Sequence, residues 1–250
     1  LALLSTLGWR LTGEERERRR LRQMFGRYVS EQVVEALLQS GERPALGGQA
    51  QTVTVLFSDI RNFTSMSERL TASEVVEMLN AYFARACAVL QEAGGSIDKF
   101  IGDAVMVEFG SPLPQPDHAA RAVRAALALQ DVAAEFALWM EQRFPGRGLP
   151  RFAIGIGLHS GEAVVGNIGS PARMEFTAIG DTVNIASRLE GVTKDMGCVI
   201  VASDATVLAA GGNLRCGRSE LLTVKGRHQP VLVFELLPRE GSEDALPGAG

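Results

Sequence analysis

The sequence is poor in the residues that build disulfide frameworks and histidine-based metal sites. It has only three cysteines and three histidines among 250 residues. The cysteines, Cys87, Cys198 and Cys216, are odd in number and have no paired spacing, which neither a disulfide framework nor a zinc site would use. We therefore expect reduced thiols in a cytosolic compartment and no histidine-rich metal site.

The chain also lacks a net positive charge and a long apolar run. Its formal net charge is −4, and hydrophobic residues make up 46% of it. This composition is typical of a globular core and gives no global basic field of the kind that marks a nucleic-acid-binding protein. The apolar start of the chain is far shorter than the about 20 residues that cross a bilayer.

The first residues nevertheless have the pattern of the end of a transmembrane helix. LALLSTLGW is followed by an arginine-rich run, and positive charges collect at the cytoplasmic end of such helices. We expect residues 1–12 to be such an end, with an ordinary amphipathic helix start as the alternative. The rest of the chain would then be the cytoplasmic part of a membrane-anchored protein, whose N-terminal membrane or sensor portion lies upstream.

Three further regions follow from composition. Residues 13–45 are predicted to form a linker helix region that could pair with its counterpart in a second chain. Glycine and proline in GERPALGGQAQ end this pattern, so the main domain is predicted to span 46–238. The polar, Gly- and Pro-rich residues 239–250 are predicted to be a disordered tail.

The main domain begins with a strand, a helix and a hairpin. A β-branched, largely apolar run predicts a buried strand at 51–60. Thr71 and Glu74 form a capping box that opens a helix to about Leu90. Two short strands within 94–110 are joined at Gly102-Asp103, a dipeptide suited to a tight turn.

The second half of the domain contains a glycine-rich segment. Five glycines between 155 and 169 lack the lysine of a phosphate loop, so they indicate turns and close backbone approach within a strand pair around His159. His159 itself is expected to be structural. The other expected elements are helices at 117–144 and 182–196 and strands near 198–203, 220–225 and 230–237. This order predicts an α+β domain with a mostly antiparallel sheet and helices packed on one face.

Two aspartates lie at the ends of predicted neighbouring strands. Asp59 follows the apolar run in FSDIRNFT, and Asp103 is at the hairpin tip in IGDAV. Either one alone is usually a turn former, but together they could hold Mg²⁺, which takes one or two carboxylates and completes its shell with water and phosphate oxygens. Two such ions can activate an attacking oxygen and neutralise a leaving one. The helix start at Asn62, Phe63 and Thr64 adds amides that favour a triphosphate beside these ions.

These residues belong to a sequence that resembles the class III nucleotidyl cyclases. The resemblance runs from Thr52 to Glu235 and is carried by five segments in family order: FSDIRNFTSMSE, GGSIDKFIGDAVMVEFG, GLHSGEAVVGNIGS, FTAIGDTVNIASRLE and VKG. It implies a ferredoxin-like βαββαβ-type cyclase homology domain. It also implies an adenylate cyclase of the threonine-bearing bacterial subclass, from a membrane-bound receptor cyclase, that converts ATP to 3′,5′-cyclic AMP and pyrophosphate.

The resemblance implies roles for the matching residues. Asp59, Asp103 and the backbone carbonyl of Ile60 would bind two metal ions, Mg²⁺ or Mn²⁺, in each active site. Lys99 and Thr177 would read the purine edge, where guanylate cyclases carry Glu and Cys. Thr177 departs from the aspartate of the animal membrane enzymes, but a hydroxyl can also accept the adenine amino proton.

The same resemblance implies contacts to the sugar and the phosphates. Asn184 would orient the ribose, Arg188 would lie against the pentavalent phosphate, and Lys225 would contact the terminal phosphates. Phe63 and Thr64 are further candidates for substrate binding. Asn184 and Arg188 are four residues apart and therefore share a helix face, a spacing that an ordinary solvated face also produces.

In this family the metal aspartates of one chain face the purine-reading residues, asparagine and arginine of the other, so a homodimer carries two composite sites. Three alternatives compete. Lys99 and Thr177 oppose a guanylate cyclase, and IGDAV stands where a diguanylate cyclase has its GGDEF signature. A catalytically inactive cyclase-like module that binds nucleotide or transmits a signal would generally lack a metal aspartate or the arginine, and this chain retains them.

Overall fold

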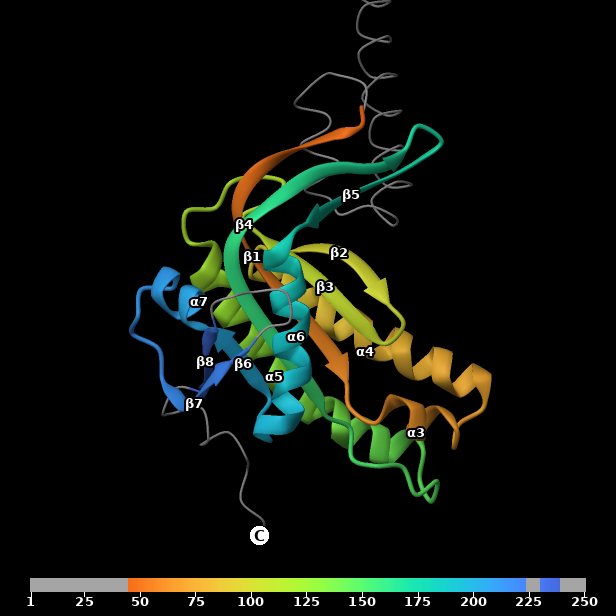
Figure 1. Ribbon diagram of the computed structural model, residues 1–250. Helices are drawn as coiled ribbons and strands as arrows, with labels where there is room; N and C mark the ends of the chain where they lie inside the picture. Colours follow the sequence, from red (N-terminus) through yellow and green to blue (C-terminus); the bar gives the residue numbers. More distant parts are fainter. Residues whose placement is uncertain (1–44, 224–229, 239–250) are drawn as a thin grey trace, which may run out of the picture.

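The computed structural model describes residues 45–223 and 230–238 (Figure 1). The predicted transmembrane end, nearly all of the predicted linker region, the predicted tail and Lys225 lie outside these residues. No helix in the two described ranges is long and apolar enough to cross a membrane. The elements are β1 (Gly47–Ile60), α3 (Phe63–Ser67), α4 (Ala72–Glu92), β2 (Ser96–Ile101), β3 (Ala104–Phe109), α5 (His118–Arg143), β4 (Ile154–Ser170), β5 (Arg173–Ile179), α6 (Asp181–Met196), β6 (Ile200–Ser203), α7 (Asp204–Ala209), β7 (Cys216–Leu222) and β8 (Val231–Leu236).

The strands form one sheet in the order β2-β3-β1-β4-β6-β8-β7, with β5 paired to β4 beside this path. β1 pairs antiparallel with both β3 and β4. β4 and β6 are parallel, and the remaining pairings are antiparallel. The predicted α+β class with a mostly antiparallel sheet is confirmed.

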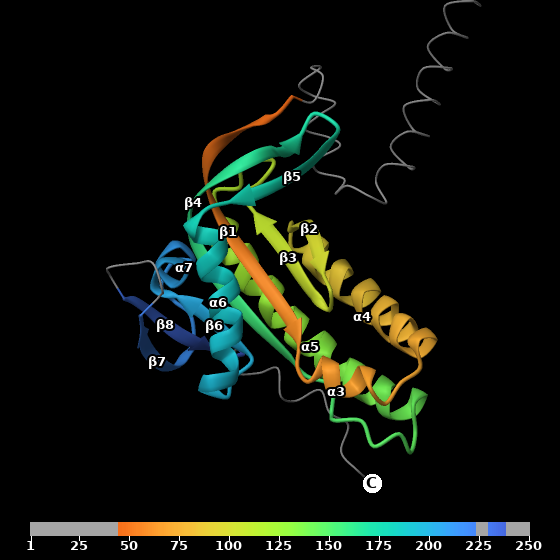
Figure 2. The ribbon, with the colours of Figure 1, turned by 45° about the vertical axis from the view of Figure 1, so that its right-hand side comes forward.

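Both faces of β1 are buried, and they meet different helices. Leu56 belongs to the main core with α4 and α5, whereas Val53, Val55 and Phe57 pack with residues of α6. Successive side chains of a strand point to opposite faces, so α4 and α5 cover one face of the sheet and α6 covers the other (Figures 1 and 2). The expectation that helices pack on one face therefore holds for α4 and α5 but not for α6.

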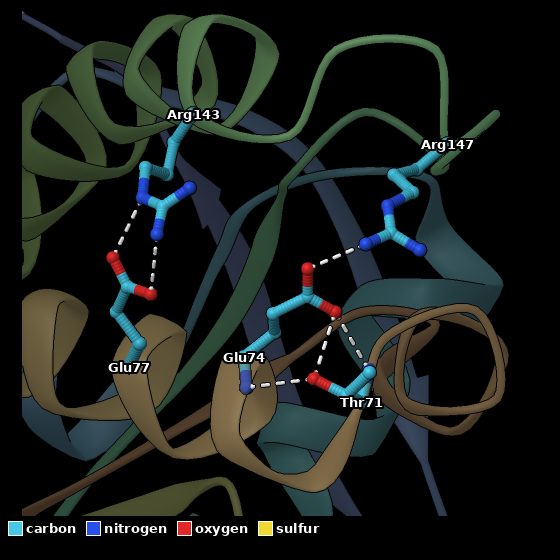
Figure 3. Close-up of polar contacts among 5 residues, drawn as sticks. All are labelled: Thr71, Glu74, Glu77, Arg143 and Arg147. Atoms are coloured by element: carbon cyan, nitrogen blue, oxygen red, sulfur yellow. Dashed lines mark hydrogen bonds and ion pairs between the residues drawn. The ribbon is translucent and has the colours of Figure 1, made fainter.

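Helix α4 begins at the predicted capping box. The hydroxyl oxygen of Thr71 accepts from the Glu74 N–H at 3.3 Å, and the Glu74 carboxylate accepts from the Thr71 N–H at 2.8 Å (Figure 3). Glu74 also pairs with Arg147 at 2.6 Å, and Glu77 pairs with Arg143 at the end of α5 at 2.7 Å. Exposed pairs of this kind contribute at most about 1 kcal/mol each, so the apolar contacts between α4 and α5 hold the two helices together.

The segment around His159 differs from the prediction. It forms one long strand, β4, and the turn that leads into β5 follows Ser170. His159 lies inside this strand, where its Nδ1 is 2.7 Å from the hydroxyl oxygen of Ser203 on β6. The histidine is buried, in agreement with the expected structural role.

The glycines of β4 explain both the error and the position of α6. A Cβ atom on Gly157 would lie 2.2 Å from the backbone nitrogen of Glu190 and 2.4 Å from the carbonyl oxygen of Ala186, both on α6. A Cβ on Gly166 would lie 2.2 Å from the Gly47 carbonyl oxygen on β1. Glycine within a strand marks either a turn or a close backbone approach, and here the close approach applies.

We predict that Gly157→Ala destabilises the domain by about 1–3 kcal/mol, because the added methyl group must push α6 away from β4. Gly191→Ala, on the helix α6 that Gly157 contacts, is the control, because a Cβ at Gly191 has nothing within 4 Å. It should stabilise the domain by roughly 0.5–1 kcal/mol, since alanine is the better helix former. Urea unfolding of the two variants measures both effects. Equal stability of Gly157→Ala and the wild type would contradict this account of the α6 contact.

Candidate active site

The two predicted metal aspartates lie together at one end of the sheet. Ser58 pairs with Val105 in the β1–β3 register, which brings Asp59 level with the turn that holds Asp103. The backbone N–H of Ile60 donates to Asp59 Oδ1 at 3.0 Å and also to the Asp103 carboxylate. Sequence pattern alone therefore led to a real pair of neighbouring carboxyl groups.

The electrostatics of this pair suit a cation. Partial burial, and then the hydrogen bond and negative charge of Asp59, raise the pKa of Asp103 to about 6. Two carboxylates this close repel each other, so the pair favours either a shared proton or a positive ion between its oxygens. The described residues contain no group of three or more His, Cys, Asp and Glu side chains that could hold a metal by themselves. A magnesium ion requires only one or two carboxylates when water and phosphate supply the remaining ligands.

A third acidic residue, Glu190 of α6, lies near this pair, and no sequence motif indicated it. Burial, followed by the charges of Asp59 and Asp103, raises the pKa of Glu190 to about 7, while Arg61 opposes the shift. The guanidinium of Arg61 is held by the hydroxyl oxygen of Thr193 at 2.9 Å and the Cys198 carbonyl oxygen at 2.8 Å. A glutamate in the middle of an amphipathic helix looks solvated in sequence, and only the contact of α6 with β4 brings it near the aspartates.

The purine-reading candidates Lys99 and Thr177 also come together, although they lie on β2 and β5. Their common partner is Asp98, which sits where a β-bulge shifts the β2–β3 register. The Thr177 hydroxyl donates to Asp98 Oδ2. Lys99 Nζ lies 3.6 Å from Asp98 Oδ1 and 2.9 Å from Glu175 Oε2. The Asp98 side chain is 2% exposed and that of Lys99 is 33% exposed, so the lysine reaches solvent while the aspartate is covered.

Behind this cluster lies a second acidic pair, formed by Asp98 and Glu108. Glu108 is buried on β3, accepts from the Ala178 N–H at 2.7 Å and shares a hydrogen bond with Asp98. Burial and then the charge of Asp98 raise the pKa of Glu108 to about 7. Burial also raises the pKa of Asp98, but Thr177 and Lys99 counteract this. Asp98 is the member of the pair that accepts from the Thr177 hydroxyl and lies beside the Lys99 ammonium, and these contacts favour its carboxylate form over that of Glu108.

The remaining candidates occupy the places that their spacing predicts. Asn184 and Arg188 lie on the exposed face of α6, opposite its buried side chains. Phe63 and Thr64 form the first turn of α3 just beyond Asp59, with Phe63 packed against the main core and Thr64 exposed. The side chain of Ile60 is buried, so only its backbone can reach the site.

The structure thus assembles the candidates in two groups. Asp59 and Asp103 form one group at the end of β1, and Lys99 and Thr177 form the other around Asp98. Within residues 45–223 and 230–238, no hydrogen bond or ion pair joins the aspartate pair to Lys99 or Thr177.

Comparisons with known proteins identify the family. Residues 47–236 match the model described as the adenylate and guanylate cyclase catalytic domain. An adenylate cyclase of Anabaena cylindrica is 36% identical over 221 residues, which cover 85% of this chain and 42% of that protein. The chain spans less than half the length of the curated relatives that it matches first.

Solved structures of two kinds of cyclase resemble the chain equally well. The crystal structure of a guanylyl cyclase has a TM-score of 0.69 and 36% identity, covering 76% of this chain and 94% of that one. The crystal structure of an adenylyl cyclase from P. aeruginosa has a TM-score of 0.69 and 33% identity, covering 78% of this chain and 98% of that one. The choice between the two purines therefore has to be argued from the residues of the site.

We predict that Asp59→Asn lowers the pKa of Asp103 from about 6 toward its usual value in metal-free protein, because the substitution removes a neighbouring negative charge. Carboxyl carbon NMR over a pH titration measures this shift. The pKa of Glu108 is an internal control and should stay near 7, because Asp98 and burial set it. An unchanged titration of Asp103 would show that the two aspartates do not interact.

Proposed function

The chain belongs to the adenylate and guanylate cyclase catalytic-domain family, and we propose that it is an adenylate cyclase. The reaction is the conversion of ATP to 3′,5′-cyclic AMP and pyrophosphate by intramolecular phosphoryl transfer. The observation that carries this proposal is the cluster in which Asp98 brings Lys99 of β2 and Thr177 of β5 to one place.

The chemistry of this cluster favours adenine over guanine. A lysine ammonium has donors only, and adenine N1 is an acceptor, whereas guanine N1 carries a hydrogen. Partial burial opposes the charged form of Lys99, but the bond to Glu175 and the charge of Asp98 outweigh it and raise the pKa of Lys99. The oxygen of Thr177 can accept from the adenine amino group, which guanine replaces with a carbonyl oxygen.

The Asp59–Asp103 pair fits divalent cations, since it offers two adjacent oxygen-donor groups whose mutual repulsion a cation would relieve. Bound Mg²⁺ or Mn²⁺ would supply charge neutralisation at the attacking and leaving oxygens of the substrate. Asp59 and Asp103 would hold the ions, with the Ile60 backbone carbonyl as a further ligand.

The other side chains position the substrate and stabilise charge. Asn184 orients the ribose so that its 3′-oxygen is in line with the α-phosphorus, and Arg188 donates to the phosphate as negative charge builds there. The backbone N–H groups of Phe63 and Thr64, together with Lys225, are assigned to the outer phosphates. Phosphoryl transfer depends mainly on such positioning and charge stabilisation. Removal of a donor like Arg188 typically costs about 3–4 kcal/mol of transition-state stabilisation.

We assign the complete site to a homodimer, in which Asp59 and Asp103 of one chain face Lys99, Thr177, Asn184 and Arg188 of its partner. The surface around the purine-reading residues supports an interface. Phe100 and Ile101, beside Lys99, are 48% and 52% exposed, and Val164 and Ile179, paired beside Thr177, are 40% and 45% exposed. Apolar side chains gathered on a surface mark protein contacts more often than free surface.

For the whole protein we propose a cyclase anchored in the cell membrane, with this domain on the cytoplasmic side. Its support is the apolar start followed by arginines, together with curated relatives more than twice as long as the matched region. The domain would then pass a signal from the upstream portion into the production of cyclic AMP.

The proposal predicts that purified dimer with Mg²⁺ or Mn²⁺ converts ATP to cyclic AMP and uses GTP roughly 10- to 1000-fold less efficiently, because guanine mispairs with both Lys99 and Thr177. Chromatographic separation of the products, with kcat/KM for each nucleotide, measures this. Equal efficiency with ATP and GTP would refute the adenine assignment. No cyclic product from either nucleotide with either metal would favour the inactive signalling module.

We predict that the double variant Lys99→Glu, Thr177→Cys shifts the preference toward GTP, since glutamate can accept from the guanine N1–H. The charge-reversal control is Lys194→Glu on the exposed surface of α6, which should leave the ratio of the two kcat/KM values unchanged if the purine is read at Lys99 and Thr177. A GTP preference that moves equally in both variants would show that overall charge, and not base reading, sets the selectivity.

A further inference from the structure

The hydroxyl of Thr177 has one proton to donate and two acceptors within reach. One acceptor is Asp98 Oδ2, and the other is the Ala178 carbonyl oxygen at 3.4 Å. A hydrogen bond to a carboxylate is shorter and roughly twice as strong as one between neutral groups. The Thr177 proton therefore points to Asp98, and the lone pairs of its oxygen face away from that carboxylate.

Asp98 is held so that it cannot turn away from Thr177. Its side chain is 2% exposed, and it shares a hydrogen bond with Glu108 on β3. Glu108 in turn accepts from the Ala178 N–H at 2.7 Å, the residue next to Thr177. Two acids of the β2–β3 hairpin thus fix both the side chain and the backbone of β5 at this position.

We propose that Asp98 is a positioning residue for purine selection, which makes the Thr177 oxygen an obligatory hydrogen-bond acceptor by taking its proton. This inference rests on the proposed function, and it assigns the selectivity to a pair of residues instead of to Thr177 alone. A free hydroxyl can donate or accept, so threonine by itself fits an amino group and a carbonyl group equally. A threonine whose proton is held by a carboxylate fits only the 6-amino group of adenine.

The contact between the Thr177 oxygen and the 6-amino group can be tested with a substrate that differs from ATP only in that group. Purine riboside 5′-triphosphate lacks the 6-amino group but keeps the N1 acceptor, so its contact with Lys99 is the same. The ratio of kcat/KM for ATP to kcat/KM for this analogue reports the contact between Thr177 and the amino group. The ratio does not depend on the fraction of active protein, because both substrates are assayed on the same preparation.

Asp98→Asn should reduce this ratio by roughly three- to tenfold, the effect of losing one aligned hydrogen bond. Asparagine has the same shape but can donate its amide hydrogens to the Thr177 oxygen, which occupies the lone pairs and frees the hydroxyl proton. The matched control is Asp131→Asn on the exposed surface of α5, which should leave the ratio unchanged.

The coupling between the two residues distinguishes positioning from a general structural effect. Thr177→Val should lower the ratio by the same factor, and Asp98→Asn added to Thr177→Val should change it no further. An Asp98→Asn enzyme that keeps the wild-type ratio, or a further drop in the double variant, would overturn the inference. Thr177→Val leaves Asp98 in place, so a wild-type ratio in this variant overturns the inference even if Asp98→Asn does not fold. A wild-type protein that makes no cyclic AMP would instead refute the proposed function itself.

Discussion

The rest of the structure depends on the antiparallel pairing of β1 with β3 on one side and β4 on the other. Because β1 is central and apolar on both faces, α4 and α5 must cover one face and α6 the other. The same register carries Asp59 to the turn that holds Asp103. β4 also pairs antiparallel with β5, and this register places Thr177 opposite Gly166. The positions of Asp59, Asp103 and Thr177 are thus a consequence of sheet register, whereas Asn184 and Arg188 are carried by α6.

Two acidic pairs on this sheet show that similar carboxyl groups behave differently in different surroundings. Asp59 and Asp103 lie at the end of the sheet and are partly exposed. Partial burial, and then the hydrogen bond and charge of Asp59, raise the pKa of Asp103 to about 6, and a cation can replace the proton there. The side chains of Asp98 and Glu108 are covered, and burial followed by the charge of Asp98 raises the pKa of Glu108 to about 7, which favours a proton shared within the pair. The first pair suits ion binding, and the second suits holding a neighbouring hydroxyl in one orientation. Position in the sheet, and not residue type, decides between the two.

Local signals predicted much of the fold, because they act within a few residues. The capping box at Thr71 and the turn at Gly102 follow from short-range hydrogen bonding and backbone freedom, and both are present. Contacts between segments that are far apart in the sequence could not be predicted from such local patterns. The strand β4 was mistaken for a hairpin because its glycines accommodate α6 and β1, and Asp98 and Glu108 were overlooked because an acid in a strand normally points to solvent. The position of Glu108 within an otherwise apolar strand could have indicated that its side chain is buried.

We propose that two chains build each active site, and a mixture of two inactive variants tests this composite site. Asp59→Ala removes a metal carboxylate and Arg188→Ala removes the phosphate donor, so each homodimer should be nearly inactive. After subunit exchange, verified with mass-tagged chains, random pairing makes half of the dimers mixed, and one of the two sites in each is intact. The account predicts recovery to about one quarter of wild-type activity at equal total protein, if the two sites act independently. A mixture that stays inactive, with both variants folded by circular dichroism, would place Asp59 and Arg188 in the same chain's site and contradict the account.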